Sequence, residues 1–488
     1  MATTDTRERR ANGLEGYFHL RERGTDVRTE VIAGLATWLT MAYILVVNPA
    51  ILSSVPDANG TSLPFPELVT VTALAAGVLT LAMGLFTNYP FAMAAGLGLN
   101  AFVAFTLVAA AGLTWPQAMG VIVIEGLVIA ALVLTGFREA VLNAIPMDLK
   151  RAIGIGIGLF IAFIGLVNAG IVVRPDAPEP IVTLEPNLTT LPILTFAIGL
   201  AITSALVALK VKGALLIGII ATTIVASIIN AFADPNVFPP GVATWPESVV
   251  DAPDFSLVGN FSLDLFDGQT VAVVTTLALI LSVMLSDFFD TMGTVIGVGG
   301  EAGLLTRDGK LPGIQRVLFV DSLGAALGGA TSSSSNTTYI ESAAGVSEGG
   351  RTGLTAVVVG VLFLLAMFLA PLPGVVPTQA TAPVLVVPFV RFAGSHPYAD
   401  EERSSAEREM FLLSGGAAIQ NLLLAFHAQG YASCWISSTL FCQQETRAAL
   451  GVGGEWHALG TVAAGRMPAG AAAPPRPPLD LGEVLRER

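Results

Sequence analysis

Three carboxylates embedded in apolar sequence are the side chains of this chain best suited to chemistry. Asp287 and Asp290 lie in the stretch SDFFDTMGT, and Glu341 lies in TTYIESAAG. Ionisable groups are costly inside a membrane and are therefore functional there by default. Apolar surroundings also favour the protonated form of a carboxylate, so such a group can exchange a proton near neutral pH. Asp287, Asp290 and Glu341 are therefore the candidate proton-coupling residues.

Neutral polar side chains near these acids could complete a binding site for a flat heterocycle. Asn100 is the polar residue of GLGLNAF, and Thr338 stands three residues before Glu341. A flat nitrogen heterocycle presents ring N–H donors and ring acceptors; a carboxylate accepts from N–H groups, and an amide both donates and accepts. The candidate substrate-binding residues are Asn100, Asp290, Thr338 and Glu341.

A structural alternative exists for every one of these acids. Each could cap a half-helix or pair with neighbouring hydroxyl groups instead of binding a ligand. The same alternative applies to Glu125 and Asp321, two further acids that lie in apolar runs.

The composition points to lipid as the solvent. The chain has 488 residues, 53% hydrophobic and 12% charged, with a mean hydropathy of +0.71, whereas soluble domains carry about 25% charged residues. A formal net charge of −13 and the lack of a basic run argue against nucleic acid as a partner. The only two cysteines, Cys434 and Cys442, form neither a disulfide framework nor a zinc site. We expect no metal and no cofactor.

Apolar runs predict eleven membrane crossings before residue 376. A transmembrane helix needs roughly 20 mainly apolar residues. Two stretches, 90–106 and 331–347, are apolar but short and broken. The nine longer runs are 31–53, 68–87, 116–137, 151–173, 192–209, 212–232, 269–293, 313–330 and 352–375.

The distribution of basic residues favours this count. With a cytoplasmic N-terminus and alternating crossings, fifteen of the sixteen Lys and Arg residues before residue 380 fall inside, and Arg174 alone falls outside. The long loop 233–268 would be external, and it contains no Lys or Arg. Positive charge accumulates on the cytoplasmic side of membrane proteins. We therefore expect a multi-pass protein of the plasma (inner) membrane whose N-terminus is cytoplasmic.

The two broken stretches are the third and tenth crossings, which occupy the same position in two successive groups of seven. Interrupted segments at matching places in two halves are typical of an inverted-repeat transporter with its site at the bilayer midplane. Gly-rich crossings can instead simply pack tightly, and this interpretation suits GIGIG at 154–158. It suits TSSSSNTTYIES poorly, because so many hydroxyl groups would lack partners in lipid.

Several long motifs carry a family resemblance. They are TEVIAGLATWLTMAYILVVNPAIL, AAGLGLNAF, IGIGLFIAFIGL, DFFDTMGT and TTYIESAAGVSEGGRTGLTA. From about residue 14 to 383 the chain closely resembles the AzgA-like purine permeases of the nucleobase–cation symporter superfamily. The resemblance implies proton-coupled uptake of adenine, guanine or hypoxanthine by a fourteen-span, seven-plus-seven inverted repeat. It also implies that Asp290 and Glu341 face the substrate with Asn100 beside them. Sodium in place of the proton, and a homodimer, are left open.

The resemblance stops after ATAP, and the following sequence is of a soluble type. An amphipathic pattern predicts a helix around 410–424. Residues 384–465 resemble the second half of a nitroreductase-fold domain, closest to the one attached to the glutamyl ligases of deazaflavin coenzyme biosynthesis. The permease family and the nitroreductase-fold domains have similar sequences around TAPVLVV. The two resemblances therefore meet at a sequence that both families share.

The predicted fold is an all-α polytopic membrane protein, an inverted repeat truncated after about eleven spans, with a partial α/β tail. The predicted domains are a cytoplasmic segment 1–28, a permease domain 29–383, a partial nitroreductase-like segment 384–465 and a flexible tail 466–488. By the resemblance, spans one to four and eight to eleven form a core, and spans five to seven form half of a gate.

The leading functional hypothesis is a non-enzymatic purine permease, impaired if the missing spans are essential. The alternative is a membrane-tethered flavin- or deazaflavin-linked reductase-like fusion. The resemblance argues against flavin binding, because the phosphate-contacting half of the reductase domain is absent. A third possibility is a product without activity.

Overall fold

The computed structural model describes residues 13–135, 162–173, 183–233, 237–239, 241–246, 248–265, 272–306 and 310–386, and the backbone of 431–436 and 461–466. The chain divides into two compact units, Met1–Pro388 and Phe389–Arg488. The predictions for residues 1–12, for GIGIG and for the helix around 410–424 lie outside the described residues, as does nearly all of the predicted flexible tail.

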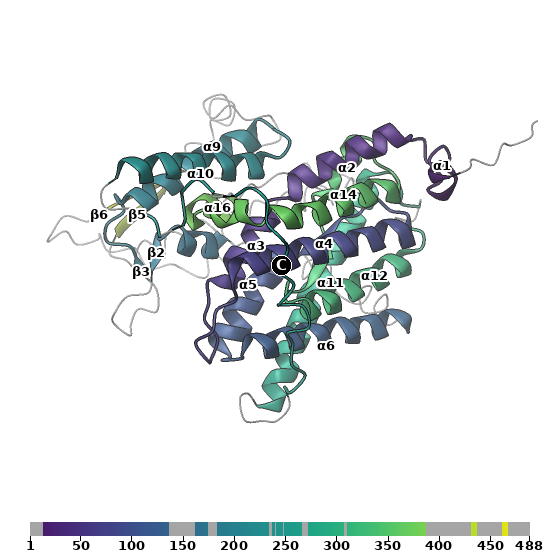
Figure 1. The fold of residues 1–488 in the computed structure, drawn as a ribbon, viewed down its shortest axis with the longest axis horizontal. Coiled ribbons are helices and arrows are strands. Elements are labelled where there is room, and N and C mark those ends of the chain that lie inside the picture. Colours follow the sequence, from purple (N-terminus) through teal and green to yellow (C-terminus); the bar gives the residue numbers. More distant parts are fainter. Residues whose placement is uncertain are drawn as a thin grey trace, which may run out of the picture. The chain divides into compact units, whose positions relative to one another are not determined.

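The first unit is a bundle of helices (Figure 1). The α-helices are α1 (Leu14–Tyr17), α2 (Val27–Met41), α3 (Ile44–Ser53), α4 (Phe65–Thr87), α5 (Leu97–Ala101), α6 (Trp115–Leu134), α9 (Leu191–Ala208), α10 (Ala214–Phe232), α11 (Val273–Glu301), α12 (Ile314–Ala330), α13 (Ser342–Ser347), α14 (Gly353–Ala366), α15 (Pro371–Gly374) and α16 (Thr378–Val386). A π-helix, Phe102–Ala110, continues α5, and a 3₁₀ turn, Met367–Leu369, continues α14.

Six described regions are long and apolar enough to cross a membrane. They are Val27–Ser53, Phe65–Thr87, Trp115–Leu134, Leu191–Ala208, Ala214–Phe232 and Val273–Glu301. Two shorter apolar helices, Leu97–Ala110 and Gly353–Leu369, fall at the predicted third and eleventh crossings. The protein is therefore a multi-pass membrane protein. Of the predicted crossing 151–173, only the part from residue 162 is described, and residues 162–168 are helical.

The eighth crossing is longer than the sequence predicts. We expected the run 269–293, in which Asp287 and Asp290 would stand at the end of the helix. That placement is wrong, because α11 continues to Glu301 and both acids lie within it. The apolar, proline-free sequence that follows keeps the helix going, and polar side chains on one face do not end a helix.

The described helices pack in two groups. One group consists of α9, α10 and α16, which pack on one another; Figure 1 shows them together. In the other group, α14 packs on α2 and α4, and α12 packs on α4 and α6. Small residues allow the close approach of helices in membranes. A Cβ added at Gly360 of α14 would lie 2.8 Å from the carbonyl oxygen of Gly77 in α4.

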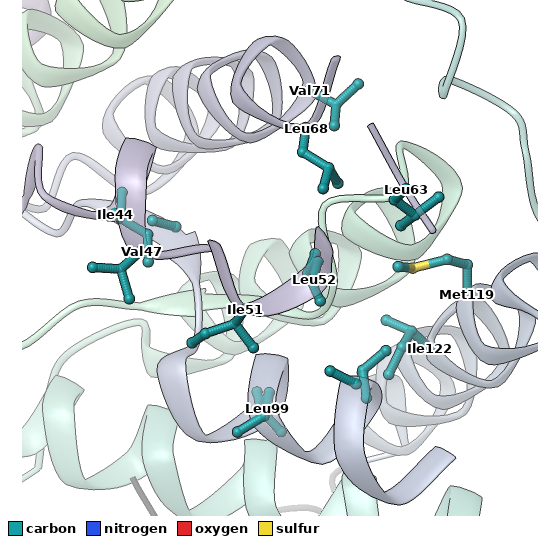
Figure 2. Close-up of a cluster of buried hydrophobic side chains, with 14 of the residues drawn as sticks. Ile44, Val47, Ile51, Leu52, Leu63, Leu68, Val71, Leu99, Met119 and Ile122 are labelled. Carbon is teal, nitrogen blue, oxygen red and sulfur yellow. The ribbon is translucent and has the colours of Figure 1, made fainter. Parts of the chain in front are cut away.

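A large apolar cluster lies mainly in the second group and extends to Ile219 of α10 and Leu385 of α16 (Figure 2). It includes Ile44 and Val47 from α3, Leu68 from α4, Leu99 from α5 and Met119 from α6. All five side chains are buried. Because α5 is anchored in this cluster, the residues next to Leu99 are held in a defined position.

A buried acid fixes the start of α14. The carboxylate of Glu30, in α2, accepts from the backbone N–H groups of Arg351 at 2.9 Å and Thr355 at 3.1 Å, and from the Thr355 hydroxyl at 2.6 Å. Glu30 is fully buried. A carboxylate at a helix N-terminus satisfies N–H groups that have no partner within the helix. Glu30 is therefore a capping residue.

Short strands qualify the prediction of an all-α fold. In the first unit, β1 (Met93–Ala95) pairs with β4 (Asn336–Thr338), and β2 (Val172–Val173) pairs with β3 (Thr183–Leu184). In the second unit, β5 (Tyr431–Ile436) pairs with β6 (Thr461–Arg466). All three pairs are antiparallel. Extended backbone was not expected in the third and tenth crossings, although both were expected to be broken.

Candidate functional site

The candidate site is built around the pairing of the third and tenth crossings. In the antiparallel ladder Met93 lies opposite Thr338, Ala94 opposite Thr337, and Ala95 opposite Asn336. One more hydrogen bond extends the ladder at each end, from Gly96 N to Ser335 O at 3.0 Å and from Tyr339 N to Ala92 O at 2.9 Å. Extended backbone at membrane depth needs such partners, because lipid offers none.

Asp321, in α12, holds β4 in place. Its Oδ1 accepts from the backbone N–H of Thr338 at 3.0 Å, and its Oδ2 accepts from the Thr291 hydroxyl at 2.6 Å. The hydroxyl oxygens of Thr291 and Thr337 are 2.8 Å apart. Asp321 is fully buried. The contacts of Asp321 are therefore those of a structural acid, as the alternative in the sequence analysis proposed. They tie α11, α12 and β4 together.

The serine run before β4 is buried and anchored from α3. Asn48 Nδ2 donates to Thr72 Oγ1 at 2.8 Å and to Ser333 O at 3.2 Å. Asn336 Nδ2 donates to Ser333 Oγ at 2.9 Å. Ser334 has a φ of 73°, a left-handed conformation that few non-glycine residues adopt. These bonds satisfy part of this polar segment, whereas the hydroxyl groups of Ser334 and Ser335 have no hydrogen-bond partner among the described residues.

Asn100 and Thr338 have polar atoms that the described chain leaves open. Asn100 is fully buried, and neither atom of its amide has a hydrogen-bond partner among the described residues. The Thr338 hydroxyl, 1% exposed, likewise has none there. A buried polar group without a partner costs about 1–3 kcal/mol. The open donors and acceptors on these two side chains are what a polar ligand would satisfy.

Glu341 comes three residues after the end of β4 and lies at the N-terminal end of α13. Its Oε1 accepts from the Tyr43 hydroxyl at 2.6 Å. Sequence reasoning missed Tyr43; its signal was a phenol inside an apolar crossing, in TMAYI. No other described residue donates a hydrogen bond to the second carboxylate oxygen, Oε2, so this oxygen can accept from a ligand.

Asp290 lies midway along α11, which packs against α5, β4 and α13. Asp290 is an exposed residue, and the charges of Asp321 and Glu341 both act on it. Asp290 therefore lies near these two acids. Asp287, three residues earlier, is fully buried.

The structure thus groups the predicted site residues around the β1–β4 pair. Asn100 follows β1, Thr338 ends β4, and Glu341 comes three residues later. Asp290 comes from α11, which contacts both broken crossings. Within the described residues no hydrogen bond joins Asn100 to Asp290 or Glu341. Glu125, in α6, is fully buried.

Comparison with known proteins decides the family. Residues 28–395 match the family model described as the permease family. The chain belongs to the permease family. Residues 373–466 also match the nitroreductase family, so the two matches overlap over residues 373–395. Both resemblances drawn from the sequence motifs are confirmed at the level of these families.

Curated members of the permease family are similar to most of this chain. The adenine permease AdeP of Escherichia coli (strain K12) is 42% identical over 76% of this chain and 78% of that protein. The guanine/hypoxanthine permease PbuG of Bacillus subtilis (strain 168) is 39% identical over 77% of this chain and 82% of that protein.

One solved structure shares the fold at low sequence identity. The transmembrane domain of the cyanobacterial bicarbonate transporter BicA matches with a TM-score of 0.55 and 12% identity, covering 82% of this chain and 97% of that one. The permease therefore has a helical membrane-transporter fold.

Replacement of Asn100 by Leu should leave the apparent melting temperature in detergent unchanged or raise it. The amide has no hydrogen-bond partner within the described chain. Replacing it therefore removes the free-energy cost of burying an unpaired polar group. The matched control is Asn48→Leu, which removes the two hydrogen bonds that Asn48 donates and should destabilise the protein by about 1–2 kcal/mol. Equal destabilisation by both variants would mean that Asn100 has a structural role.

Proposed function

We propose that this permease binds a purine nucleobase between the third, eighth and tenth crossings, and that uptake across the plasma (inner) membrane needs in addition the spans missing from its gate. The single observation that carries the binding proposal is the fully buried amide of Asn100, whose donor and acceptor are both open among the described residues. The relatives support the substrate class, since AdeP is named an adenine permease and PbuG a guanine/hypoxanthine permease.

Each open group suits one part of a purine. Oε2 of Glu341 and the carboxylate of Asp290 can accept ring or exocyclic N–H groups. The Asn100 amide can donate to a ring nitrogen or carbonyl oxygen while accepting from an adjacent N–H. The Thr338 hydroxyl can do either. These groups together complement a ring edge that carries both donors and acceptors.

Uptake is proposed to be coupled to a proton taken up by a carboxylate in the site. Asp290 and Glu341 are the first candidates because their negative charges act on the same neighbours, Tyr43 and Tyr339. Two carboxylates close together in an apolar region favour sharing of a proton. Asp287 is the third candidate. Sodium as the coupling ion is the alternative that the experiments below separate.

The architecture proposed for transport is a seven-plus-seven inverted repeat in which this chain retains the core and half of the gate. The antiparallel pairing of the third and tenth crossings supports the repeat. The packing of α9, α10 and α16 mainly on one another supports a distinct gate group. The proposed domains keep the bounds 1–28, 29–383, 384–465 and 466–488, and the N-terminus is placed in the cytoplasm.

A reductase-like fusion is the second candidate function, and the match of residues 373–466 to the nitroreductase family favours it. A purified chain that carries a flavin would show a bound yellow chromophore with absorption near the flavin bands. We propose that the tail binds no flavin, because the residues that contact the flavin phosphate in that fold lie in the half not represented here.

Glu341→Gln and Asp290→Asn should each weaken purine binding by roughly 1.5–3 kcal/mol, the usual contribution of a charge-assisted hydrogen bond. Each substitution keeps the shape of the side chain, so yield and melting temperature should change little. Binding of labelled adenine, guanine and hypoxanthine to the purified protein is the measurement. Asp264→Asn, at an exposed loop position, is the matched control. Unaltered affinity in both site variants would make the two acids structural.

In the version completed with three final spans of a relative after residue 383, uptake should fall as the external pH rises and should collapse with a protonophore. The reason is that a proton symporter needs a proton from the external side for each cycle, and proton availability falls with pH. Radiolabelled purine uptake between pH 5.5 and pH 8, with and without sodium, is the measurement. Dependence on sodium together with indifference to the protonophore would contradict proton coupling.

The tail should be dispensable for binding, and the missing spans should be essential for uptake. Three versions need comparison in cells without their own purine uptake: the chain as it is, the chain without residues 391–488, and the chain with three final spans of a relative after residue 383. Binding should be equal in the first two, because the candidate site lies before residue 342. Uptake should appear only in the third, because alternating access needs a complete bundle for the core to move against. Robust uptake by the first version would show that half of a gate suffices.

A further inference from the structure

Tyr43 occupies the interruption in the first crossing. Helix α2 ends at Met41 and α3 begins at Ile44, so Tyr43 stands in the short break between them. Its side chain is 2% exposed. A phenol hydroxyl buried in an apolar bundle costs free energy unless it finds a partner, and here the partner is Glu341.

The Tyr43 hydroxyl and the Glu341 carboxylate form a short bond between distant parts of the chain. The hydroxyl donates to Oε1 at 2.6 Å across 298 residues of sequence. Within the described residues Tyr43 is the one side chain that is hydrogen-bonded to this carboxylate. With Oε1 held in this way, the plane of the carboxylate and the direction of Oε2 are set by the first crossing.

The neighbouring groups do not compete for this role. The Tyr339 hydroxyl donates to the carbonyl oxygen of Ala95 at 2.6 Å, so it holds β1. Asp290 is an acceptor when ionised, and its charge acts on both tyrosines. Among the two tyrosines and Asp290, therefore, only Tyr43 is placed to orient Glu341.

We propose that Tyr43 is a positioning residue, which holds Oε1 of Glu341 so that Oε2 faces the purine. The inference rests on the proposed function and adds a residue from the first crossing to a site otherwise built from the third, eighth and tenth. A phenol hydroxyl can donate to a carboxylate and can accept from a protonated carboxyl group. Tyr43 therefore keeps Glu341 hydrogen-bonded in both forms while a proton and the purine come and go.

The competing explanation is that Tyr43 only fills space, since its ring belongs to the same apolar cluster as Ile44 and Leu99. The variant Tyr43→Phe separates the two explanations, because it keeps the ring and removes the hydroxyl. Tyr89→Phe is the matched control: the Tyr89 hydroxyl also donates at 2.6 Å, but to the backbone of Pro312.

The experiment compares equilibrium binding of labelled purine to four purified full-length proteins: the unaltered chain, Tyr43→Phe, Glu341→Gln and the double variant. Tyr43→Phe should weaken binding roughly 5- to 20-fold, the scale of one hydrogen bond. The double variant should bind no more weakly than Glu341→Gln, because the hydroxyl acts only through that carboxylate. Tyr89→Phe should bind as the unaltered chain does.

Infrared spectroscopy supplies a reading that simple packing would not change. The carboxylate band that disappears in Glu341→Gln should shift in Tyr43→Phe and stay in place in Tyr89→Phe. If Tyr43→Phe does not fold, a ring-fluorinated tyrosine at position 43, which keeps the ring and the hydroxyl, should still move that band.

Four outcomes would overturn the inference. The inference is overturned if the carboxylate band does not shift in Tyr43→Phe. It is also overturned if the purine affinity of Tyr43→Phe equals that of the unaltered chain. Provided that the unaltered chain binds purine, both outcomes leave the proposed function standing. Additive losses in the double variant do the same. No purine binding by the unaltered chain overturns the proposed function together with this inference.

Discussion

The backbone pairing of β1 with β4 is the constraint on which the site depends. At membrane depth an unpaired N–H or C=O group has no water to bind, so extended backbone persists only where protein satisfies it. The ladder from Met93 to Ala95 provides that satisfaction for the tenth crossing, and Asp321 adds a side-chain acceptor to it. Asn100 and Glu341 then follow the two strands within a few residues, so pairing the strands brings the candidate binding groups into one region.

Hydrogen-bond satisfaction distinguishes the structural polar groups from the candidate functional ones. Glu30 and Asp321 are buried acids that accept two or more donors from neighbouring segments, and their contacts hold helices and strands together. Asn100 is as deeply buried but is open among the described residues, and Glu341 has one oxygen held by Tyr43. Burial alone therefore does not identify a site in this permease. An open donor or acceptor narrows the choice, but other buried atoms, such as the Thr203 hydroxyl and the Trp38 N–H, are also open among the described residues. What sets Asn100 and Thr338 apart is their position beside the β1–β4 pair.

The join between the two families shows how context decides local structure. Residues 373–395 match both family models. In the first unit, Thr378–Val386 is a helix packed against α9 and α10, with Pro383 inside it. The resemblance to the nitroreductase fold predicts a strand for the same APVLVV sequence. A short apolar run rich in valine suits either state, and in the first unit the neighbouring helices bury it as a helix.

The sequence by itself determined the membrane class, most crossings in the described chain and the broken character of the third and tenth, because long apolar runs and buried hydroxyls have few physical solutions. It also identified the acidic residues that lie within apolar runs, where burying a charge costs free energy. It misplaced the end of the eighth crossing, because the polar residues of SDFFDTMGT resemble a boundary when their facing is unknown. Only the tertiary structure decided that Asp321 is a structural acid and that Tyr43 holds Glu341. The reason is that the hydrogen-bond partner of a buried polar group can come from a segment as far as 298 residues away in the sequence. Local sequence does not specify such partners.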